Sequence, residues 1–299
     1  MAFGGTGADR EAVTRSVLLP DGRRIAYAEY GSPHGRTVLY CHGFPGSREE
    51  ARLLLPAIRD LGVRVLAPDR PGYGGSDPKR GRRLSDFARD AIALLDTLGL
   101  GSVAVMGVSG GGPYALSLLA AYPERITRLA LVGALGPPEA IAACHRDFVP
   151  FVARAWRLAQ TMRALLAPVT VWPLVRLLRL RGRLGDVRFL AGADEAVLAD
   201  ARVREVLIGS QREGLRQGGW GAAQDLVLYL RPWDFRVTQT SPPVTLWAGE
   251  DDRVVPVAMV YELGRLLPQA GLRVIPGEGH YSLPVHYARA ILADLVGAA

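Results

Sequence analysis

The sequence predicts an α/β protein, a mostly parallel, doubly wound sheet of about eight strands with a helical insertion. From Val17 onward, short apolar segments of strand type alternate with amphipathic segments of helix type, with glycine and proline between them. Such alternation is typical of a parallel sheet that helices cover on both faces. The alternation stops over residues 134–236, where every plausible element is helical. With 299 residues, 49% of them hydrophobic, the chain is long enough for a sizeable core.

The strands are predicted from short apolar runs bounded by turn residues. The first two form a hairpin in "SVLLPDGRRIAYAEYG", which turns at Asp21-Gly22. The other strands are predicted in "TVLYCHG", "VRVLAP", "SVAVMG", "ITRLALVG", "PPVTLWAG" and "LRVIP". Helices are predicted between them at Ser47–Leu61, Leu84–Leu98, Pro113–Ala121, Pro256–Leu267 and Pro284–Val296.

These elements divide the chain into a tail, a core and a cap. Residues 1–14 form a loose N-terminal tail, residues 15–133 and 237–299 form the core, and residues 134–236 form a helical cap inserted into it. A loop of that length without structure is rare, which favours helices in the cap. The tail lacks the basic start and apolar segment of a signal peptide, and no apolar run reaches the roughly 18 residues of a spanning helix. We therefore expect a soluble, cytoplasmic protein.

Composition and charge argue against several classes of protein. The net charge is +7 and the isoelectric point is near 9.8, which raises nucleic acid as a partner. The basic residues are scattered, however, and no nucleic-acid motif occurs, so we expect a solvated basic surface and no nucleic-acid partner. The two cysteines, Cys41 and Cys144, lack the spacing of a disulfide framework or a metal site. No cofactor and no metal ion are expected.

One short stretch carries a candidate nucleophile. In "SVAVMGVSGGGPYAL", Ser109 lies in the turn between a buried strand, Val103–Met106, and a helix that begins near Pro113. Gly107 and Gly111 flank it in the G-x-S-x-G spacing, which suits a strained strand-to-helix turn that neighbouring turns approach closely. The stretch lacks the G-x-G-x-x-G order of a dinucleotide turn, and the chain has no G-x-x-x-x-G-K-[ST] phosphate loop.

Candidate partners for a serine nucleophile follow later strands. Asp251 and Asp252 lie in "EDDRVVP" after the strand "VTLWAG", and His280 lies in "GEGHYSLP" after the strand "LRVIP". The chain order Ser, Asp, His is that of one serine-triad architecture. Because catalytic groups in such sheets gather at the carboxyl ends of the strands, the three side chains can meet at one edge.

Five landmarks in order make the chain resemble the α/β-hydrolase superfamily. They are "HGFPGS" at 42–47, "DRPGYGGSD" at 69–77, "GVSGG" at 107–111, "GEDDRVVP" at 249–256 and "GEGHYSL" at 277–283. The resemblance covers nearly everything except the tail and the interior of the cap. It implies the α/β-hydrolase fold and a serine hydrolase with a helical cap.

The resemblance also implies a role for each site residue. Ser109 would be the nucleophile, His280 the general base and acid, and Asp252 the carboxylate that orients the imidazole. The backbone N–H groups of Phe44 and Gly110 would form the oxyanion hole.

Neighbouring polar residues receive other interpretations. Asp252 is favoured over Asp251 because only Asp252 fits the family pattern G-x-x-D-x-x-V-P. His42 is predicted to order the oxyanion loop, Asp69 to shape a turn, and Glu278 to be a solvated loop charge.

The preferred function is hydrolysis of a carboxylic ester of a small or medium, neutral, hydrophobic substrate. Serine at position 109 argues against haloalkane dehalogenases and epoxide hydrolases, which share the "HGFP" landmark but resemble one another in using an aspartate nucleophile. Relatives that keep Ser, His and Asp include aminopeptidases that release proline, C–C bond hydrolases and cofactor-free perhydrolases. These remain the enzymatic alternatives, and a small-molecule receptor with an intact triad is the non-enzymatic one.

The cap carries a basic segment. Residues 148–185 contain seven arginines and no acidic residue, and Arg154, Arg157, Arg176 and Arg179 lie between apolar residues at three- and four-residue spacing. This pattern predicts helices with one apolar and one basic face. We expect the apolar face to roof the active site; contact of the basic face with an anionic membrane or an acidic substrate is the alternative.

Overall fold

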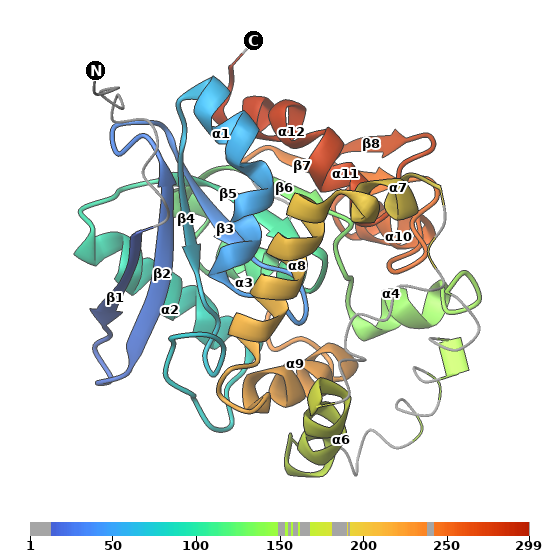
Figure 1. Cartoon of the computed structure of the whole chain (residues 1–299), viewed down its shortest axis with the longest axis horizontal. Helices are drawn as coiled ribbons and strands as arrows, with labels where there is room; N and C mark the ends of the chain where they lie inside the picture. Colours follow the sequence, from blue (N-terminus) through green and yellow to red (C-terminus); the bar gives the residue numbers. More distant parts are fainter. Residues whose placement is uncertain are drawn as a thin grey trace.

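One eight-stranded sheet runs through the chain. The computed structural model describes residues 13–148, 153–154, 157, 161, 168–180, 190, 192–237 and 242–298. The strands are β1 (Val13–Leu18), β2 (Arg24–Gly31), β3 (Thr37–Cys41), β4 (Arg64–Pro68), β5 (Val103–Val108), β6 (Ile126–Val132), β7 (Val244–Gly249) and β8 (Gly271–Ile275). Their order is β1-β2-β4-β3-β5-β6-β7-β8 (Figure 1). β1–β2 and β2–β4 pair antiparallel and all other neighbours pair parallel, which confirms the predicted fold class.

Helices connect most of the strands. In the core they are η1 (Arg48–Leu54), α1 (Leu55–Leu61), α2 (Leu84–Thr97), η2 (Ser109–Gly111), α3 (Gly112–Ala121), η3 (Pro123–Arg125), α10 (Ala258–Leu266), α11 (Ser282–His286) and α12 (Ala288–Val296), the η elements being 3₁₀ helices. Between β6 and β7 they are α4 (Pro138–Ala143), α6 (Pro168–Leu180), α7 (Ala193–Ala199), α8 (Ala201–Gly214) and α9 (Trp220–Leu230).

Two predicted helices are divided in the structure. The helix predicted at Ser47–Leu61 is 3₁₀ up to Leu54 and α-helical only from Leu55. Pro56 explains the change, because it has no N–H to continue an α-helical ladder and is tolerated only in a first turn. The last predicted helix is divided into α11 and α12 at Tyr287.

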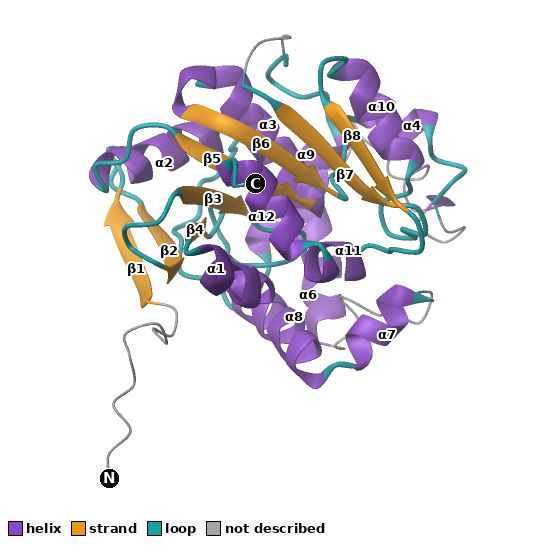
Figure 2. Cartoon of the chain, turned by 90° about the horizontal axis from the view of Figure 1, so that it is seen from above, coloured by secondary structure: helices purple, strands orange, loops and turns teal. Residues whose placement is uncertain are grey.

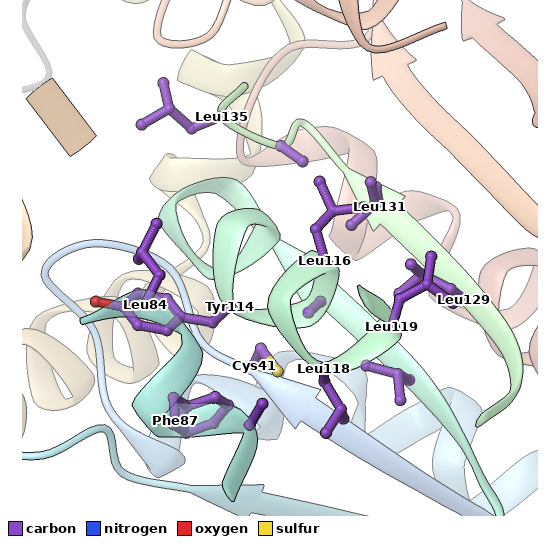
Figure 3. Packing of buried hydrophobic residues seen from close by; sticks show 14 of the residues in the cluster. Cys41, Leu84, Phe87, Tyr114, Leu116, Leu118, Leu119, Leu129, Leu131 and Leu135 are labelled. Atoms are coloured by element: carbon purple, nitrogen blue, oxygen red, sulfur yellow. The ribbon is translucent and has the colours of Figure 1, made fainter. Parts of the chain in front are cut away.

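Helices cover both faces of the sheet, so the chain has two cores (Figure 2). α2, α3 and α10 lie on one face, and α1 and α12 lie on the other. Side chains of β5 alternate between the cores, with Val105 in the first and Met106 in the second. Figure 3 shows part of the first core, where Tyr114 of α3 lies near Phe87 of α2. This rigid centre fixes the end of β5, where the candidate nucleophile follows.

The elements described between β6 and β7 are all helices. α8 packs on η1 of the core, and α6 packs on α9 (Figure 1). Val175 of α6 belongs to the same buried hydrophobic cluster as Tyr73 of the core, and the Trp172 indole N–H donates to the carbonyl of Gly218 at 3.0 Å. The Trp172 and Trp220 rings lie 6.4 Å apart. These helices therefore lie against the core.

The predicted tail lies outside the described residues except for its last two positions, which belong to β1. Within the described segments, no helix is both long and apolar enough to cross a membrane.

Candidate active site

Ser109 lies in a strained turn directly after β5. Its φ is +53°, in the left-handed region that residues with a Cβ rarely adopt. The flanking glycines allow this turn to pack closely. A Cβ on Gly107 would lie 2.7 Å from Ala115 Cβ, and one on Gly111 would lie 2.1 Å from the carbonyl oxygen of Cys41. The turn therefore places a half-buried serine at the carboxyl end of the sheet, and glycine is required on both sides of it.

The structure brings Ser109, His280 and Asp252 together from three different strand ends. His280 Nε2 lies 3.0 Å from Ser109 Oγ, and His280 Nδ1 lies 2.7 Å from Asp252 Oδ2. The other carboxylate oxygen of Asp252 accepts the backbone N–H groups of Val254 and Val255, each at 2.8 Å. Both carboxylate oxygens of Asp252 therefore accept hydrogen bonds, and one of the donors is Nδ1 of His280. Because Nδ1 carries the proton of the neutral imidazole, Nε2 can accept a proton from Ser109.

Asp251, the alternative carboxylate, is exposed. Only its backbone N–H contributes locally, to the carbonyl of Glu278 at 2.9 Å. Gly133 lies against the pair formed by His280 and Asp252. Its φ is +50°, and a Cβ there would lie 3.2 Å from His280 Nδ1. Asp252, the residue that the G-x-x-D-x-x-V-P pattern favours, is therefore the carboxylate that faces His280.

The loop that carries His280 is held by a carboxylate from the insertion. Asp194, in the first turn of α7, is buried and accepts three consecutive backbone N–H groups: His280 at 2.9 Å, Tyr281 at 2.8 Å and Ser282 at 2.9 Å. A Cβ on Gly279 would lie 2.3–2.5 Å from this carboxylate, so glycine is required there. The loop and α7 are thus bound to each other by hydrogen bonds to a charged acceptor.

Three carboxylates influence the charge of His280. Burial alone would lower the pKa of His280, but Asp252, Asp194 and Glu50 together raise it above its ordinary value. Glu50 is buried below the loop at 42–47, where its Oε1 accepts the Gly43 N–H at 2.8 Å, and burial raises the pKa of Glu50. The site thus favours an imidazolium ion, the species that forms when His280 takes a proton from Ser109.

The two predicted oxyanion donors lie on adjacent segments. A Cβ on Gly110 would lie 2.7 Å from Phe44 Cβ and 2.6 Å from the Tyr229 hydroxyl, so the nucleophile turn and the loop at 42–47 are in close contact. Phe44 packs edge-on against Tyr229 with ring centroids 5.8 Å apart. The Phe44-Pro45 peptide bond is cis, and Pro45 has no N–H.

Three neighbouring polar residues have defined contacts. His42 Nδ1 lies 2.9 Å from the Gly43 carbonyl, and burial holds the pKa of His42 well below its ordinary value, so the ring is neutral. Asp69 accepts the backbone N–H groups of Arg48 at 2.8 Å and Gly75 at 2.9 Å, which holds the turn after β4. Glu278 is less solvated than expected: its side chain is only 13% exposed, and one carboxylate oxygen lies 3.0 Å from His286 Nδ1.

A buried polar cluster lies behind the loop at 42–47. Its centre is Asp225 of α9, which is fully buried and accepts five donors. They are the guanidinium groups of Arg70 (3.0 Å) and Arg82 and the hydroxyls of Tyr73 (2.8 Å), Tyr114 (2.5 Å) and Tyr229 (3.2 Å). Burial would raise the pKa of Asp225, but the two guanidinium groups lower it to about 2. A carboxylate of the insertion is therefore ionised inside the core at neutral pH.

Sequence reasoning missed Asp194, Asp225, Arg70 and Glu50. A signal existed for Asp225, which is the one charged residue in the apolar helix "WGAAQDLVLYL" and therefore needs a buried partner. Arg70 lies inside the "DRPGYGGSD" landmark, and Glu50 lies three residues after "HGFPGS". Asp194 has no comparable signal, because its partners are backbone N–H groups.

The basic segment of the cap is described only in part. Arg154, Arg157 and Arg176 are exposed, and Arg176 lies over the Trp172 ring at 5.3 Å. The side chain of Arg179 and most of the predicted apolar roof lie outside the described residues. Among the side chains that the structure does describe, no group of three or more His, Cys, Asp or Glu is arranged to hold a metal ion.

Comparison with known proteins finds a family match, relatives of similar sequence and a similar solved structure. Residues 36–178 match the family described as the alpha/beta hydrolase fold. The chain is 28% identical over 279 residues to a putative 2-succinyl-6-hydroxy-2,4-cyclohexadiene-1-carboxylate synthase of Bacillus subtilis, covering 89% of this chain and 92% of that protein. It is also 28% identical over 271 residues to a 2-hydroxy-6-oxononadienedioate/2-hydroxy-6-oxononatrienedioate hydrolase of Burkholderia vietnamiensis, covering 89% and 88%. A thermophilic esterase of Thermogutta terrifontis has a similar fold, with a TM-score of 0.66, 23% identity and coverage of 97% and 99%.

Proposed function

Because the chain belongs to the α/β-hydrolase superfamily, we propose that it is a serine hydrolase that cleaves a carboxylic ester of a small or medium, neutral, hydrophobic substrate. The observation that supports this most directly is the hydrogen-bonded series Ser109–His280–Asp252, with separations of 3.0 and 2.7 Å. A serine hydroxyl against a buried imidazole that is oriented by a carboxylate is the arrangement that activates oxygen nucleophiles.

The first half of the reaction forms an acyl-enzyme. Ser109 Oγ attacks the ester carbonyl carbon as His280 Nε2 takes the hydroxyl proton, and the carbonyl oxygen becomes an oxyanion. The backbone N–H groups of Phe44 and Gly110 stabilise that oxyanion. Collapse of the tetrahedral intermediate breaks the bond to the alkoxy oxygen, which leaves as the alcohol with the proton from His280.

The second half regenerates the enzyme. A water molecule attacks the acyl carbon as His280 Nε2 takes one of its protons, and the same two N–H groups stabilise the second oxyanion. The intermediate then releases the carboxylic acid and returns the proton to Ser109 Oγ. Asp252 remains ionised throughout and stabilises the imidazolium formed in each half.

The relative from Burkholderia vietnamiensis favours one second candidate. Its substrates, as named, are 2-hydroxy-6-oxo dioates, so hydrolysis of a C–C bond beside a ketone is the alternative reaction for the same three residues. Release of N-terminal proline, perhydrolysis and a receptor function remain further alternatives from the family resemblance.

A substrate panel tests the proposal. p-Nitrophenyl esters with acyl chains from about two to sixteen carbons, proline p-nitroanilide and a 2-hydroxy-6-oxo dienoate are offered to the wild type and to Ser109→Ala. Turnover of short or medium esters that is lost in Ser109→Ala supports the esterase. Preferential turnover of the anilide or the dienoate would replace it with the corresponding alternative, and single-turnover cleavage of every ester would favour a receptor.

A further inference from the structure

Arg70 connects the insertion to the loop that carries Phe44. Its guanidinium group is fully buried, and its Nε donates to the carboxylate of Asp225 on α9 at 3.0 Å. The two terminal nitrogens donate to main-chain carbonyls of the loop, one to Gly43 at 2.9 Å and the other to His42. One planar group therefore binds a carboxylate of the insertion and two consecutive carbonyls of the core.

The Gly43 carbonyl and the Phe44 N–H belong to the same peptide group. That group is planar and trans, so fixing its carbonyl also fixes the direction of its N–H, which points the opposite way. Three donors hold this carbonyl: Arg70, the Gly46 N–H at 3.0 Å and His42 Nδ1 at 2.9 Å. Of these three, only Arg70 is positively charged, because the His42 ring is neutral.

From this geometry we infer that Arg70 is a positioning residue for ester hydrolysis, an inference that rests on the proposed function. Asp225 holds the Arg70 guanidinium, and the guanidinium orients and polarises the peptide group whose Phe44 N–H binds the oxyanion. A charged donor on a carbonyl draws electron density from the amide and strengthens the N–H of the same group as a donor. Arg70 itself does not contact the substrate.

The other proposed donor is held without a charge. The Gly110 N–H shares its peptide group with the Ser109 carbonyl, which accepts the Leu135 backbone N–H at 3.0 Å. A change at Arg70 therefore weakens one donor and leaves the second intact. Because the oxyanion exists only in the transition state and the intermediates, the loss is expected in transition-state binding and not in binding of the ester.

A purely structural role for this ion pair is the competing explanation. Breaking a buried pair is destabilising wherever it lies, so a fall in activity alone does not distinguish the two. The ratio of KM for an ester to Ki for a trifluoromethyl ketone with the same acyl chain does distinguish them. In the complex, Ser109 Oγ adds to the carbonyl carbon of the ketone and its proton passes to His280, so the ketone oxygen becomes an oxyanion. The Ki of the ketone therefore reports how well the two N–H donors bind that oxyanion. Unfolded protein changes neither KM nor Ki.

The experiment compares Arg70→Lys and Asp225→Asn with the wild type. Lysine keeps the charge but cannot bind the carboxylate and both carbonyls at once, and asparagine removes the charge that holds Arg70. Arg23→Gln is the matched control, because it breaks the pair with Asp90 (2.6 Å) that joins the turn before β2 to α2. Tyr73→Phe removes one hydroxyl that donates to Asp225 but removes no charge. If the charge variants fail to fold, the ratio of KM to Ki is measured in this variant instead.

We expect the ratio of KM to Ki to fall about 10- to 100-fold in Arg70→Lys and Asp225→Asn, below the 10²- to 10³-fold cost of losing a whole donor. Tyr73→Phe should lower it about threefold, and Arg23→Gln should leave it unchanged. A ratio within 1.5-fold of the wild type in every folded variant of this cluster overturns the role of Arg70. A wild type that hydrolyses no ester would instead count against the proposed function.

Discussion

Replacing Asp194 with asparagine tests how far the insertion supports the catalytic histidine. Asn keeps the size of the side chain, but one of its two acceptor oxygens becomes an NH₂ group facing backbone N–H groups, so at least one of three hydrogen bonds is lost. A hydrogen bond to a charged acceptor contributes about 1.5–3 kcal/mol. We expect the free energy of unfolding to fall by that amount and the melting temperature to fall by roughly 2–5 °C.

The same change affects the chemistry. Asp194 is one of the charges that raise the pKa of His280, so its loss lowers that pKa and moves the acid limb of the kcat/KM profile to lower pH. In the wild type this limb should lie above the ordinary histidine value of about 6.5, with activity rising as the imidazole loses its proton. A less stabilised imidazolium and a displaced His280 loop should together lower kcat about tenfold.

The assay is ester hydrolysis from pH 5 to 9, with thermal unfolding followed in parallel. Asp200→Asn is the matched control, because Asp200 caps the next helix of the insertion through the Arg202 N–H at 2.8 Å and is exposed. That variant should match the wild type in pH profile and kcat, since asparagine caps a helix as well as aspartate. An Asp194→Asn enzyme with a lower melting temperature but an unchanged acid limb and kcat would refute the reasoning.

The remaining predictions concern the nucleophile, its carboxylate and the cap. Ser109→Ala should lose on the order of 10⁶ in kcat and still fold, as circular dichroism will show; retention of a tenth of the activity would contradict a serine mechanism. Asp252→Asn should lower kcat about 10⁴-fold while Asp251→Asn stays close to the wild type, and the reverse ranking would refute the assignment. Removing Arg176 and Arg179 together should barely change kcat/KM for a neutral ester; salt-sensitive sedimentation with anionic vesicles, lost in that double variant, would instead support membrane contact.

The parts of the site that could be predicted are those fixed by strand ends and glycine turns. Ser109, Asp252 and His280 each follow a parallel strand in a short loop, and parallel strands bring such loops to one edge. The residue types and their order were therefore enough to predict that these side chains meet. The helix predicted at Ser47–Leu61 was predicted less accurately, because its hydrogen bonding changes from 3₁₀ to α-helical next to Pro56.

The contacts of the insertion could not be predicted in the same way. Asp194 binds N–H groups 86 to 88 residues further along the chain, and Asp225 binds Arg70 across 155 residues. Such partners depend on how the inserted helices lie against the core, which no local pattern specifies. The partners of Asp194 are also backbone N–H groups, which the side chains of the sequence do not mark. The hydrogen bonds between α7 and the His280 loop can therefore be found only from the structure.

The central claim is that Ser109 is the nucleophile of an acyl-enzyme, and covalent labelling tests it most directly. Wild-type protein is treated with an alkyl fluorophosphonate while ester hydrolysis is followed, and the labelled peptide is identified by mass spectrometry. The account predicts one adduct per chain, on Ser109, with loss of activity in proportion to labelling and no labelling in a His280→Ala variant on the same time scale. Full ester hydrolysis by protein labelled at Ser109, or inactivation with the adduct on another residue, would contradict it.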